Sequence, residues 1–575
     1  MNLQEMIREL KSDGEIVTEV LERWAQKTPQ KTLVYYGEED RHISYAEFNA
    51  LANSIGHGLR TLGIGQGDRV SLFLFNPLVA ILAMVGIWKI GAWYCPINFN
   101  YKGRLLSYQI NDTNPKLLLT ESSLVPLVNE VRDELPALPL ILHQPAPGDH
   151  DHRADATAPD RKFSVTAFGD LLRGPRDNVG LALRARDAAN IVYTSGTTGP
   201  AKGVVHPYRY MNQYTFNYRK LMTPEDVIYN DLPMYHVGGA FFNFNRAVWA
   251  GCTMALWDKF SPTLFWQRIR DCGASHCILL DVMVPWLMNA PAGPQDRLNG
   301  LNKVHMQPLP NYFRDVARRF GFDIVTCGFG QTESGNPLLG LLEGVAEGEG
   351  TPPELYKGHA RVELRAVAER YGYPYIPVGQ RIPERYMGRP TPFHEVAVLD
   401  DEDEECPPGV LGHLCFRPKL PHMYMHEYFN KPEATRKVFA NQWFHTGDGA
   451  IRNADGSFCF VDRIGGFIRS RGENISSYQV EDILNSHEAI MASAVFPVPA
   501  REGEEEDVVA YIIRQPGNAL DEAALRGWIS GRMPKFMWPR HIRFVDDFPR
   551  TPTNKVEKYK LKQELMAELG IAPRT

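Results

Sequence analysis

The stretch TSGTTGPAKG, Thr194 to Gly203, has the residue types of a loop that holds phosphate. Hydroxyl side chains alternate with glycines, and one cation, Lys202, closes the set. Glycine permits positive φ and a close approach of backbone N–H groups to an anion. The preceding apolar run, residues 188–193, predicts a buried strand that leads into a turn. We therefore expect this stretch to bind the phosphates of a nucleotide triphosphate.

This stretch has two other interpretations, a P-loop and a flexible linker. A P-loop needs GxxxxGK followed by Ser or Thr and then a helix. Here Ala201 precedes Lys202, Gly203 follows it, and residues 204–207 predict a strand ended by Pro207 rather than a helix. A flexible linker rich in glycine and threonine is the alternative for the segment taken alone.

Four further motifs follow in order. They are Phe329-Gly330-Gln331-Thr332-Glu333, the stretch WFHTGD (443–448), Asp462-Arg463 with the loop 470–475, and the stretch PRTPTNK (549–555). Together with the first stretch they resemble the signatures of the adenylate-forming enzymes: acyl-CoA synthetases, firefly-type luciferases and amino-acid adenylation domains. Each motif alone is weak, but five in order make chance a poor explanation. The stretch RGENISSYQVE (471–481) is most similar to bacterial acyl-CoA ligases of the crotonobetaine/carnitine type.

The resemblance implies an α/β fold in two domains. Residues 1–462 would form a large N-terminal AMP-binding domain of layered β-sheets and helices. Residues 463–575 would form a small, hinged and mobile α+β C-terminal domain that carries the catalytic Lys555. The alternation of predicted strands and helices along the chain independently favours α/β layers.

The resemblance also implies a reaction in two steps. A carboxylate attacks the α-phosphate of ATP to give an acyl-adenylate and pyrophosphate, and the thiol of coenzyme A then displaces AMP. The chain would thus be an AMP-forming acid–thiol ligase that binds ATP, Mg²⁺ and coenzyme A and a small carboxylic acid. Two alternatives remain: adenylation for another acceptor, such as a carrier protein or a luciferase-like oxidation, and a catalytically impaired relative.

Each motif acquires roles from the resemblance. Glu333 would help to ligate Mg²⁺, Thr332 would bond the α-phosphate, and Lys555 would bridge the attacking carboxylate and the α-phosphate. The β- and γ-phosphates would be held by Thr194, Ser195, Gly196, Thr197, Thr198, Gly199 and Lys202. Nucleotide contacts would come from Phe329, which would stack on the adenine, from Gly330 and Gln331 beside it in the motif, from Asp448 at both ribose hydroxyls and from Arg463 at ribose or phosphate oxygens. Arg471, Gly472 and Glu473 would lie along the pantetheine tunnel.

The acid would lie near His236, Gly238, Gly239 and Ala240, with Gly328 as the floor of its pocket. Small residues beside aromatic ones indicate an apolar slot. An aliphatic, alicyclic or aryl acid would fit it, and the sequence does not choose among them.

Three departures from the family pattern motivate the impaired-relative alternative. Asn554 stands where glycine usually precedes the lysine, although asparagine tolerates the left-handed region. Gly465 and Gly466 replace a basic residue and the hinge aspartate. The stretch 305–310 (HMQPLP) replaces the Gly-Gly-Ala-Pro stretch that lines the adenine. Lys555 also precedes other lysines, so a solvated charge run is the alternative reading of that residue.

Bulk properties exclude several classes of protein. The 575 residues carry a net charge of −6 and a pI near 6.3, which gives no support for a nucleic-acid partner. The eight scattered cysteines contain no CxxC pair and suggest reduced thiols in a cytoplasmic protein. The N-terminus lacks the apolar core of a signal peptide. The stretch 70–88 is too interrupted for an integral membrane segment. A buried strand (70–75), a helix (78–89) and a second strand (92–97) are expected instead. Peripheral membrane contact and a homodimer are left open.

Other patterns predict local structure. Residues 311–320 predict a helix with Phe313, Val316, Ala317 and Phe320 inward, followed by a strand over 322–327. A second helix is expected from Ser476. Two segments suggest surface excursions: 144–160, whose DHDH (149–152) we expect to be a solvated loop without organised side chains, and 341–386, an insertion with a helical stretch at 361–370 and an unknown role.

Overall fold

The computed structural model describes residues 1–154, 156–194, 201–280, 283–463, 467–470, 473–500, 506–530, 532–533, 535–550 and 556–571. Compact packing divides the chain into two units. The first comprises Met1–Thr194, Ala201–Val396 and Phe416–Trp443, and the second comprises Ala397–Cys415 and the described residues from Phe444 onward. The domain boundary expected after Asp462 stays a prediction.

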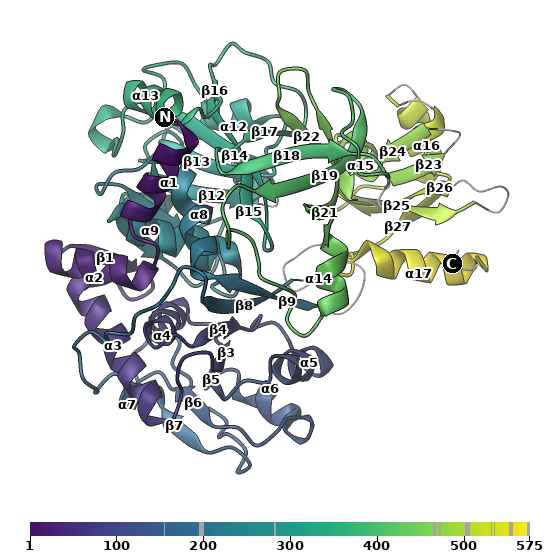
Figure 1. Cartoon of the computed structure of the whole chain (residues 1–575). Coiled ribbons are helices and arrows are strands. Elements are labelled where there is room, and N and C mark those ends of the chain that lie inside the picture. Colours follow the sequence, from purple (N-terminus) through teal and green to yellow (C-terminus); the bar gives the residue numbers. More distant parts are fainter. Residues whose placement is uncertain are drawn as a thin grey trace. The chain divides into compact units, whose positions relative to one another are not determined.

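One sheet of the first unit ends in the hairpin around the phosphate-loop motif (Figure 1). Its strands are parallel except for β9, which runs antiparallel to β8. Helix α4 (Pro77–Lys89) is buried along its whole length because its residues are apolar on nearly every side. In spatial order the strands are β7 (Val165–Ala167), β6 (Leu140–His143), β5 (Leu117–Glu121), β3 (Arg69–Phe73), β4 (Trp93–Pro96), β8 (Ala188–Thr194) and β9 (Lys202–Pro207).

A second sheet of this unit carries the Thr332-Glu333 motif at the end of β14. Strands β10 to β14 run parallel to one another, and β15 returns antiparallel to β14. In order the strands are β17 (Tyr386–Pro390), β15 (Gly335–Glu343), β14 (Ile324–Gln331), β13 (Lys303–Gln307), β12 (His276–Leu280), β10 (Val227–Asn230), β11 (Thr253–Leu256), β1 (Thr32–Tyr36) and β2 (Arg41–Ser44), with β16 (Tyr375–Ile376) beside β15.

Helix α8 (Tyr208–Arg219) links the two sheets. The Tyr208 hydroxyl donates to the carbonyl of Trp88 in α4, and the Tyr218 hydroxyl donates to that of Cys327 in β14. The other helices of the unit are α1 (Leu3–Ser12), α2 (Val17–Lys27), α3 (Tyr45–Thr61), α4 (Pro77–Lys89), α5 (Arg104–Thr113), α6 (Val125–Glu130), α7 (Phe168–Leu171), the π-helix η2 (Gly238–Asn245), α9 (Arg246–Ala250), α10 (Phe265–Cys272), α11 (Met283–Asn289), α12 (Phe313–Phe320), α13 (Arg361–Tyr371) and α14 (Pro432–Val438).

Several local expectations are confirmed. Helix α12 buries Phe313, Val316, Ala317 and Phe320 and ends at Gly321, whose φ of 79° is the left-handed conformation of a helix C-cap. Stretch 70–88 forms β3 and α4, and β4 follows it. All eight cysteines are free. The α/β fold class is therefore confirmed in the described residues.

The segment 341–386 is not a surface excursion throughout, and that part of the expectation is wrong. Leu341 and Leu342 are buried in β15, because the strand crosses the centre of the second sheet. Helix α13 forms as expected, and the Tyr371 hydroxyl at its end donates to the Glu9 carboxylate of α1. The amino group of Met1 donates to the carbonyl of Arg370 at 2.8 Å. The segment thus anchors the N-terminal helix.

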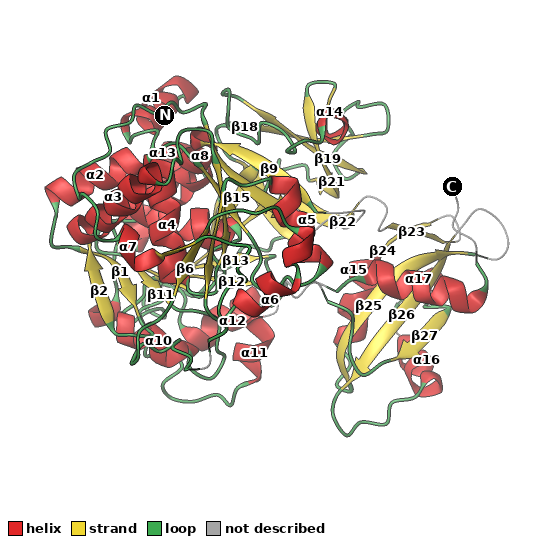
Figure 2. Ribbon diagram, turned by 90° about the horizontal axis from the view of Figure 1, so that it is seen from below, coloured by secondary structure: helices red, strands yellow, loops and turns green. Residues whose placement is uncertain are grey.

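The second unit has a small sheet packed on both faces. Strand β26 (Glu506–Arg514) runs antiparallel to β25 (Ile490–Pro499) and parallel to β27 (His541–Phe544). Helices α15 (Ser477–Asn485) and α16 (Glu522–Ser530) contribute to the core on one face, and α17 (Lys558–Leu569) to that on the other (Figure 2). The remaining strands are β18 (His394–Leu399), β19 (Leu411–Pro418), β21 (Trp443–Arg452), β22 (Phe458–Arg463), β23 (Phe467–Ser470) and β24 (Glu473–Ser476), with β20 (Phe439–Ala440) at the end of the first unit.

Candidate active site

The phosphate-loop motif begins and ends on a paired hairpin. Thr194 of β8 faces Lys202 of β9 in the antiparallel register, and the Thr194 hydroxyl donates to the Lys202 carbonyl at 3.5 Å. The carbonyl of Ala201 accepts a hydrogen bond of 3.0 Å from the Tyr108 hydroxyl of α5. Both ends of the loop are therefore fixed. The loop residues themselves, Ser195 to Pro200, lie outside the described residues.

A distant segment, residues 425–429, runs alongside β9. The amide of His426 donates to the Val205 carbonyl at 2.8 Å, and the amide of Phe429 donates to the Gly203 carbonyl at 2.7 Å. The Val205 amide returns a bond of 3.0 Å to the carbonyl of Glu427. These backbone bonds place Tyr428 beside the strand that starts with Lys202.

Tyr428 brings two expected site residues together. Its hydroxyl donates to Oε1 of Glu333 at 2.7 Å. The ammonium of Lys202 lies 4.8 Å from the centre of its ring, within cation–π range. The amide of Met425 donates to the carbonyl of Glu333 at 2.9 Å, which also fixes the backbone there. Lys202 and Glu333 thus contact the same phenol, Lys202 at the face of the ring and Glu333 at the hydroxyl.

The backbone at Thr332 is held by a buried histidine. Nε2 of His206 lies 2.7 Å from the Thr332 carbonyl, and a carbonyl can only accept, so the ring proton is on Nε2. Burial lowers the pKa of His206 to about 3 despite this bond, and the ring is neutral. Its centre is 4.1 Å from that of Tyr210. A side chain of β9, that of His206, therefore fixes the backbone at Thr332.

The glycines of the second motif permit close packing. A Cβ at Gly330 would lie 2.1 Å from Oδ1 of Asn336, and one at Gly328 would lie 2.5 Å from the Leu338 carbonyl and 2.9 Å from the Tyr218 hydroxyl. Phe329 is half-buried, and its ring meets that of Phe416 edge-on at 5.6 Å. Gln331 is the last residue of β14 and faces Gly335 of β15. Close packing by itself therefore explains both glycines.

In the second unit, the Thr-Gly-Asp motif lies in β21. Asp448 is 3% exposed and its backbone faces that of Arg463 in β22. The Asp448 amide donates to Oγ1 of Thr446 at 3.0 Å, and that hydroxyl donates to the Leu414 carbonyl. Asp448 and Arg463 are thus cross-strand neighbours in the backbone register, as residues with a common ligand would be.

The structure does not describe several of the residues expected at the site. Lys555, Arg471 and Gly472 lie outside the described residues, as do Ser195, Gly196, Thr197, Thr198 and Gly199. Glu473 is described through its backbone, which pairs with Ser470 across β23 and β24. The roles expected of all these residues stay predictions.

The residues expected around the acid are contributed by the start of η2 and the loop before it. His236 is exposed, and its Nδ1 accepts from the Gly238 amide at 3.2 Å. A Cβ at Gly239 would lie 2.7 Å from the Pro233 carbonyl, and Ala240 is 1% exposed. A π-helix often marks a functional site.

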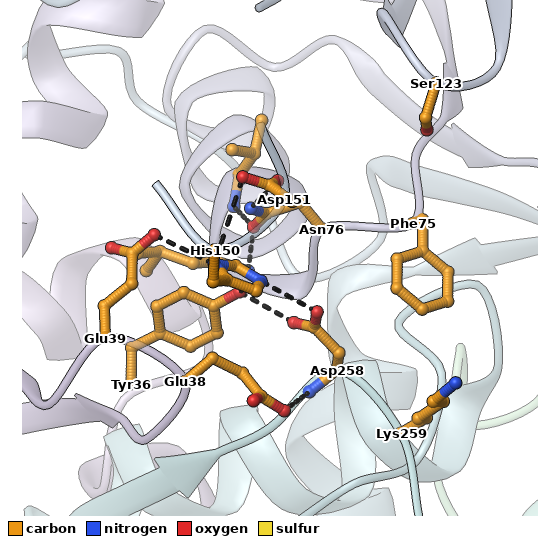
Figure 3. A network of polar contacts seen from close by, with 12 residues as sticks. Tyr36, Glu38, Glu39, Phe75, Asn76, Ser123, His150, Asp151, Asp258 and Lys259 are labelled. Carbon is orange, nitrogen blue, oxygen red and sulfur yellow. Dashed lines mark hydrogen bonds and ion pairs between the residues drawn. The ribbon is translucent and has the colours of Figure 1, made fainter. Parts of the chain in front are cut away.

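The DHDH stretch is organised, contrary to expectation (Figure 3). His150 contacts Oε1 of Glu39 at 3.1 Å through Nδ1 and Oδ2 of Asp258 at 2.9 Å through Nε2. Asn76 donates to Asp151 at 2.9 Å, and Tyr36 donates to Asp258 at 2.7 Å. The expectation is wrong because the partners lie on β1, at the start of α4 and after β11, far away in sequence.

Charge fixes the protonation state of this cluster. Burial alone would lower the pKa of His150, but the hydrogen bond and charge of Asp258, with Glu39 and Asp151, outweigh it and raise the pKa above its ordinary value. Glu39, His150 and Asp151 offer ligand atoms within 4.8 Å of one another. Both ring nitrogens already contact carboxylates, so the contacts favour an imidazolium rather than a metal ligand.

Comparison with known proteins covers nearly the whole chain. The sequence pattern of the AMP-binding enzyme family matches residues 21–429, and that of the AMP-binding enzyme C-terminal domain matches residues 479–555. The chain belongs to the AMP-binding enzyme family. The expected membership of the adenylate-forming superfamily is thereby confirmed.

Relatives of this AMP-binding enzyme include CoA ligases. Crotonobetaine/carnitine–CoA ligase of Salmonella heidelberg strain SL476 is 28% identical over 532 residues, covering 91% of this chain and 93% of that protein. The anthranilate CoA ligase AuaEII in complex with anthranoyl-AMP is 21% identical, with a TM-score of 0.77 over 96% of this chain and 98% of that one. ATP-bound MatB from Rhodopseudomonas palustris is 22% identical, with a TM-score of 0.74 over 96% and 99%. The two structures share the fold.

No helix in the described part of this AMP-binding enzyme is both long and apolar enough to span a bilayer. The expectation for residues 70–88 agrees with that finding. Helix α4 is 13 residues long and packs against α3 inside the first unit.

Proposed function

We propose that this protein is an ATP-dependent carboxylate–CoA ligase that releases AMP and pyrophosphate. This proposal rests mainly on the arrangement of Lys202, Tyr428 and Glu333 at the base of the phosphate-loop hairpin. A cation at the ring face of one phenol and a carboxylate at its hydroxyl suit a triphosphate and the counter-ion bound to it. The CoA-ligase names of relatives that span most of the chain support the same activity.

Glu333 is our candidate ligand for Mg²⁺. Its Oε1 accepts a hydrogen bond from the Tyr428 hydroxyl, which fixes the carboxylate. A hard cation prefers carboxylate and phosphate oxygens, so the donor type fits. Mg²⁺ bound there would neutralise charge on the pyrophosphate leaving group. We propose that Lys202 and the hydroxyls and amides of 194–199 hold the β- and γ-phosphates.

In the first step, an oxygen of the acid attacks the α-phosphorus and pyrophosphate leaves. We propose that Thr332 bonds the α-phosphate, that Lys555 bridges it to the carboxylate, and that Asp448 accepts from the ribose hydroxyls. Phe329, Gly330 and Gln331 would border the adenine, and Arg463 would bind ribose or phosphate oxygens. Catalysis here is mostly positioning and charge stabilisation.

In the second step, the sulfur of coenzyme A attacks the acyl carbon and AMP leaves. We propose that Arg471, Gly472 and Glu473 line the path of the pantetheine arm, and that the acid lies near His236, Gly238, Gly239, Ala240 and Gly328. A cytoplasmic location, where ATP and coenzyme A are available, fits the activity.

A panel of carboxylic acids, scored for AMP and pyrophosphate with and without coenzyme A, tests this function. We expect pyrophosphate release with at least one acid, and AMP release that depends on coenzyme A. Pyrophosphate with no effect of coenzyme A would instead favour another acceptor, such as a carrier protein. No pyrophosphate with any acid would favour a catalytically impaired relative.

A further inference from the structure

A small cavity lies in the first unit between helices and the second sheet. Its volume is about 10 Å³, roughly that of one water molecule. Helix α8, the start of α9 and strands β12 to β14 contribute its lining, and α13 adds Leu364. The polar part of the lining is made by Tyr218, Arg246, His276, Lys303, His305 and Thr326. Such a lining is unusual so deep in a sheet protein.

Arg246 is the central feature of this lining. Arg246 is only 3% exposed, and its guanidinium lies 4.4 Å from the centre of the Phe242 ring. One N–H donates to Oδ1 of Asn243 at 3.1 Å. Among the described residues, Nε has no hydrogen-bond partner and no carboxylate lies within ion-pair distance of Arg246. A buried charge of this kind ordinarily has a counter-ion.

The neighbouring charges do not supply one. Asp226 lies 3.5 Å from Nζ of Lys303 and 3.4 Å from Nδ1 of His276, so its charge is shared with another cation. Burial lowers the pKa of His276 well below its ordinary value and that of His305 to about 4, which leaves both rings neutral. Burial lowers the pKa of Arg246 only to about 10. The cations Arg246 and Lys303 therefore have a single anion near them, Asp226.

Some polar atoms around the cavity have no hydrogen-bond partner among the described residues. Nε2 of His276 is buried without a partner in the described part of the chain. His305, in contrast, is fully occupied by Thr326 at 3.0 Å and Gln307 at 2.9 Å. The unused donor is therefore Nε of Arg246, because neutral His276 has its proton on Nδ1 beside Asp226 and its Nε2 is an acceptor.

The cavity adjoins the region in which we expect the acid. Thr326 and Gly328 are two residues apart on β14 and so lie on one face of the sheet. Tyr218, which lines the cavity, has its hydroxyl 2.9 Å from the position of a Cβ at Gly328. Helix η2 connects Gly238 and Gly239 to Arg246. The polar lining differs from the apolar slot expected from the sequence.

We propose that this cavity is an anion site, in which one small anionic group pairs with Arg246. The group is either the far acidic end of the carboxylic acid that the enzyme activates or a free inorganic anion. The first source rests on the proposed function, whereas the second does not. Occupation by the acid's far end would make the enzyme selective for acids with a second anionic group.

Bromide is the probe for the site itself. We expect crystals of the wild-type protein in bromide to show an anomalous peak in the cavity, at hydrogen-bond distance from Arg246. In solution, bromide should raise the thermal midpoint in a saturable manner at constant ionic strength. Arg246→Met should abolish both effects. Arg268→Met is the matched control, because Arg268 is also nearly buried but pairs with Glu38 at 3.1 Å.

The source of the anion is resolved by pairs of acids of equal length with one or two carboxylates. If the acid supplies the anion, kcat/KM should be at least tenfold higher for the acid with two carboxylates than for the acid with one. Arg246→Met should reduce this ratio of kcat/KM values at least tenfold. Bromide should compete with the acid that has two carboxylates. If a free anion supplies it, bromide should bind without any such preference. Both outcomes support an anion site.

The proposal is overturned if wild-type crystals show no bromide in the cavity, bromide does not alter the midpoint, and Arg246→Met leaves the ratio unchanged. Because the first two measurements use the wild-type protein, they hold even if Arg246→Met fails to fold. Bromide in the cavity of a protein that activates no acid would refute the proposed function and leave the anion site intact.

Discussion

The Tyr428 hydroxyl donates a hydrogen bond of 2.7 Å to Oε1 of Glu333, across a sequence separation of 95 residues. The same phenol presents its ring face to the ammonium of Lys202 at 4.8 Å. One side chain thus fixes the spacing between the candidate metal ligand and the cation of the phosphate loop. A fixed spacing matters because phosphoryl chemistry depends on preorganised charge.

Tyr428→Phe should weaken the use of MgATP. It removes the bond to Glu333 and keeps the ring beneath Lys202. A hydrogen bond to a charged group contributes about 1.5–3 kcal/mol, so we expect kcat/KM for MgATP to fall about tenfold or more. Steady-state kinetics at a saturating acid concentration measures this. Tyr371→Phe, which removes a tyrosine–carboxylate bond between α13 and Glu9, is the control. Equal kinetics for both variants would contradict the role of Tyr428.

Lys555→Ala should strongly and selectively reduce adenylation. A cation about 4 Å from developing charge contributes about 4 kcal/mol at an effective dielectric of 20, and half of that is more than tenfold in rate. We expect pyrophosphate exchange to fall at least that far, while thioester formation from preformed acyl-adenylate persists.

Lys562→Ala is the control for that experiment, because it also removes a lysine from the tail after Lys555. Lys558 is unsuitable as a control, since it pairs with Glu481 at 2.8 Å and supports the fold of the second unit. If Lys555→Ala exchanges pyrophosphate at the wild-type rate, the solvated charge run is the correct reading.

Arg361→Ala should destabilise the first unit. Arg361 is 7% exposed and bonds Oδ1 of Asp323 at 2.8 Å, so its loss leaves a buried carboxylate without its cation. Breaking such a pair costs about 3–5 kcal/mol in the free energy of unfolding. Urea unfolding followed by tryptophan fluorescence measures the change. Arg370→Ala removes an exposed pair with Glu9 and should cost less than about 1 kcal/mol. Similar losses in the two variants would count against the prediction.

His150 should make the stability of the first unit depend on pH. Its pKa is raised in the folded protein, so its contribution is complete below the unfolded value of about 6.5 and is lost as pH rises through the folded value. The charged and titratable groups around it are Tyr36, Glu38, Glu39, His143, Asp151, Asp258 and Lys259. The pKa of Asp151 is already lowered to about 2, and so that group does not titrate in this range.

Thermal midpoints from pH 6 to 9 check this dependence. We expect the wild-type midpoint to fall relative to that of His150→Gln as pH rises above about 6.5. His152→Gln is the matched control, because His152 is exposed and its ring contacts a backbone carbonyl, that of Pro145, rather than a carboxylate. Parallel curves for wild type and His150→Gln would show that the imidazolium contributes nothing.

Local patterns predicted the elements that carry the motifs. The inward residues of α12 follow from a helical period of 3.6, and the strand before the phosphate loop follows from an apolar run that ends at glycine and threonine. Lys202, Thr332 and Glu333 were identified from motif order alone. Tyr428 was missed, since nothing in its own neighbourhood distinguishes it from any half-buried tyrosine.

The sequence by itself determined the family, the α/β class and the motif residues, because periodicity, turn chemistry and motif order are properties of neighbouring residues. Only the tertiary structure decided which side chains support them. His206 reaches Thr332 across 126 residues, and His150 reaches Asp258 across 108. The unpaired charge of Arg246 likewise depends on strands and helices folded around it. Contacts of this kind depend on packing between distant segments, and no local pattern encodes them.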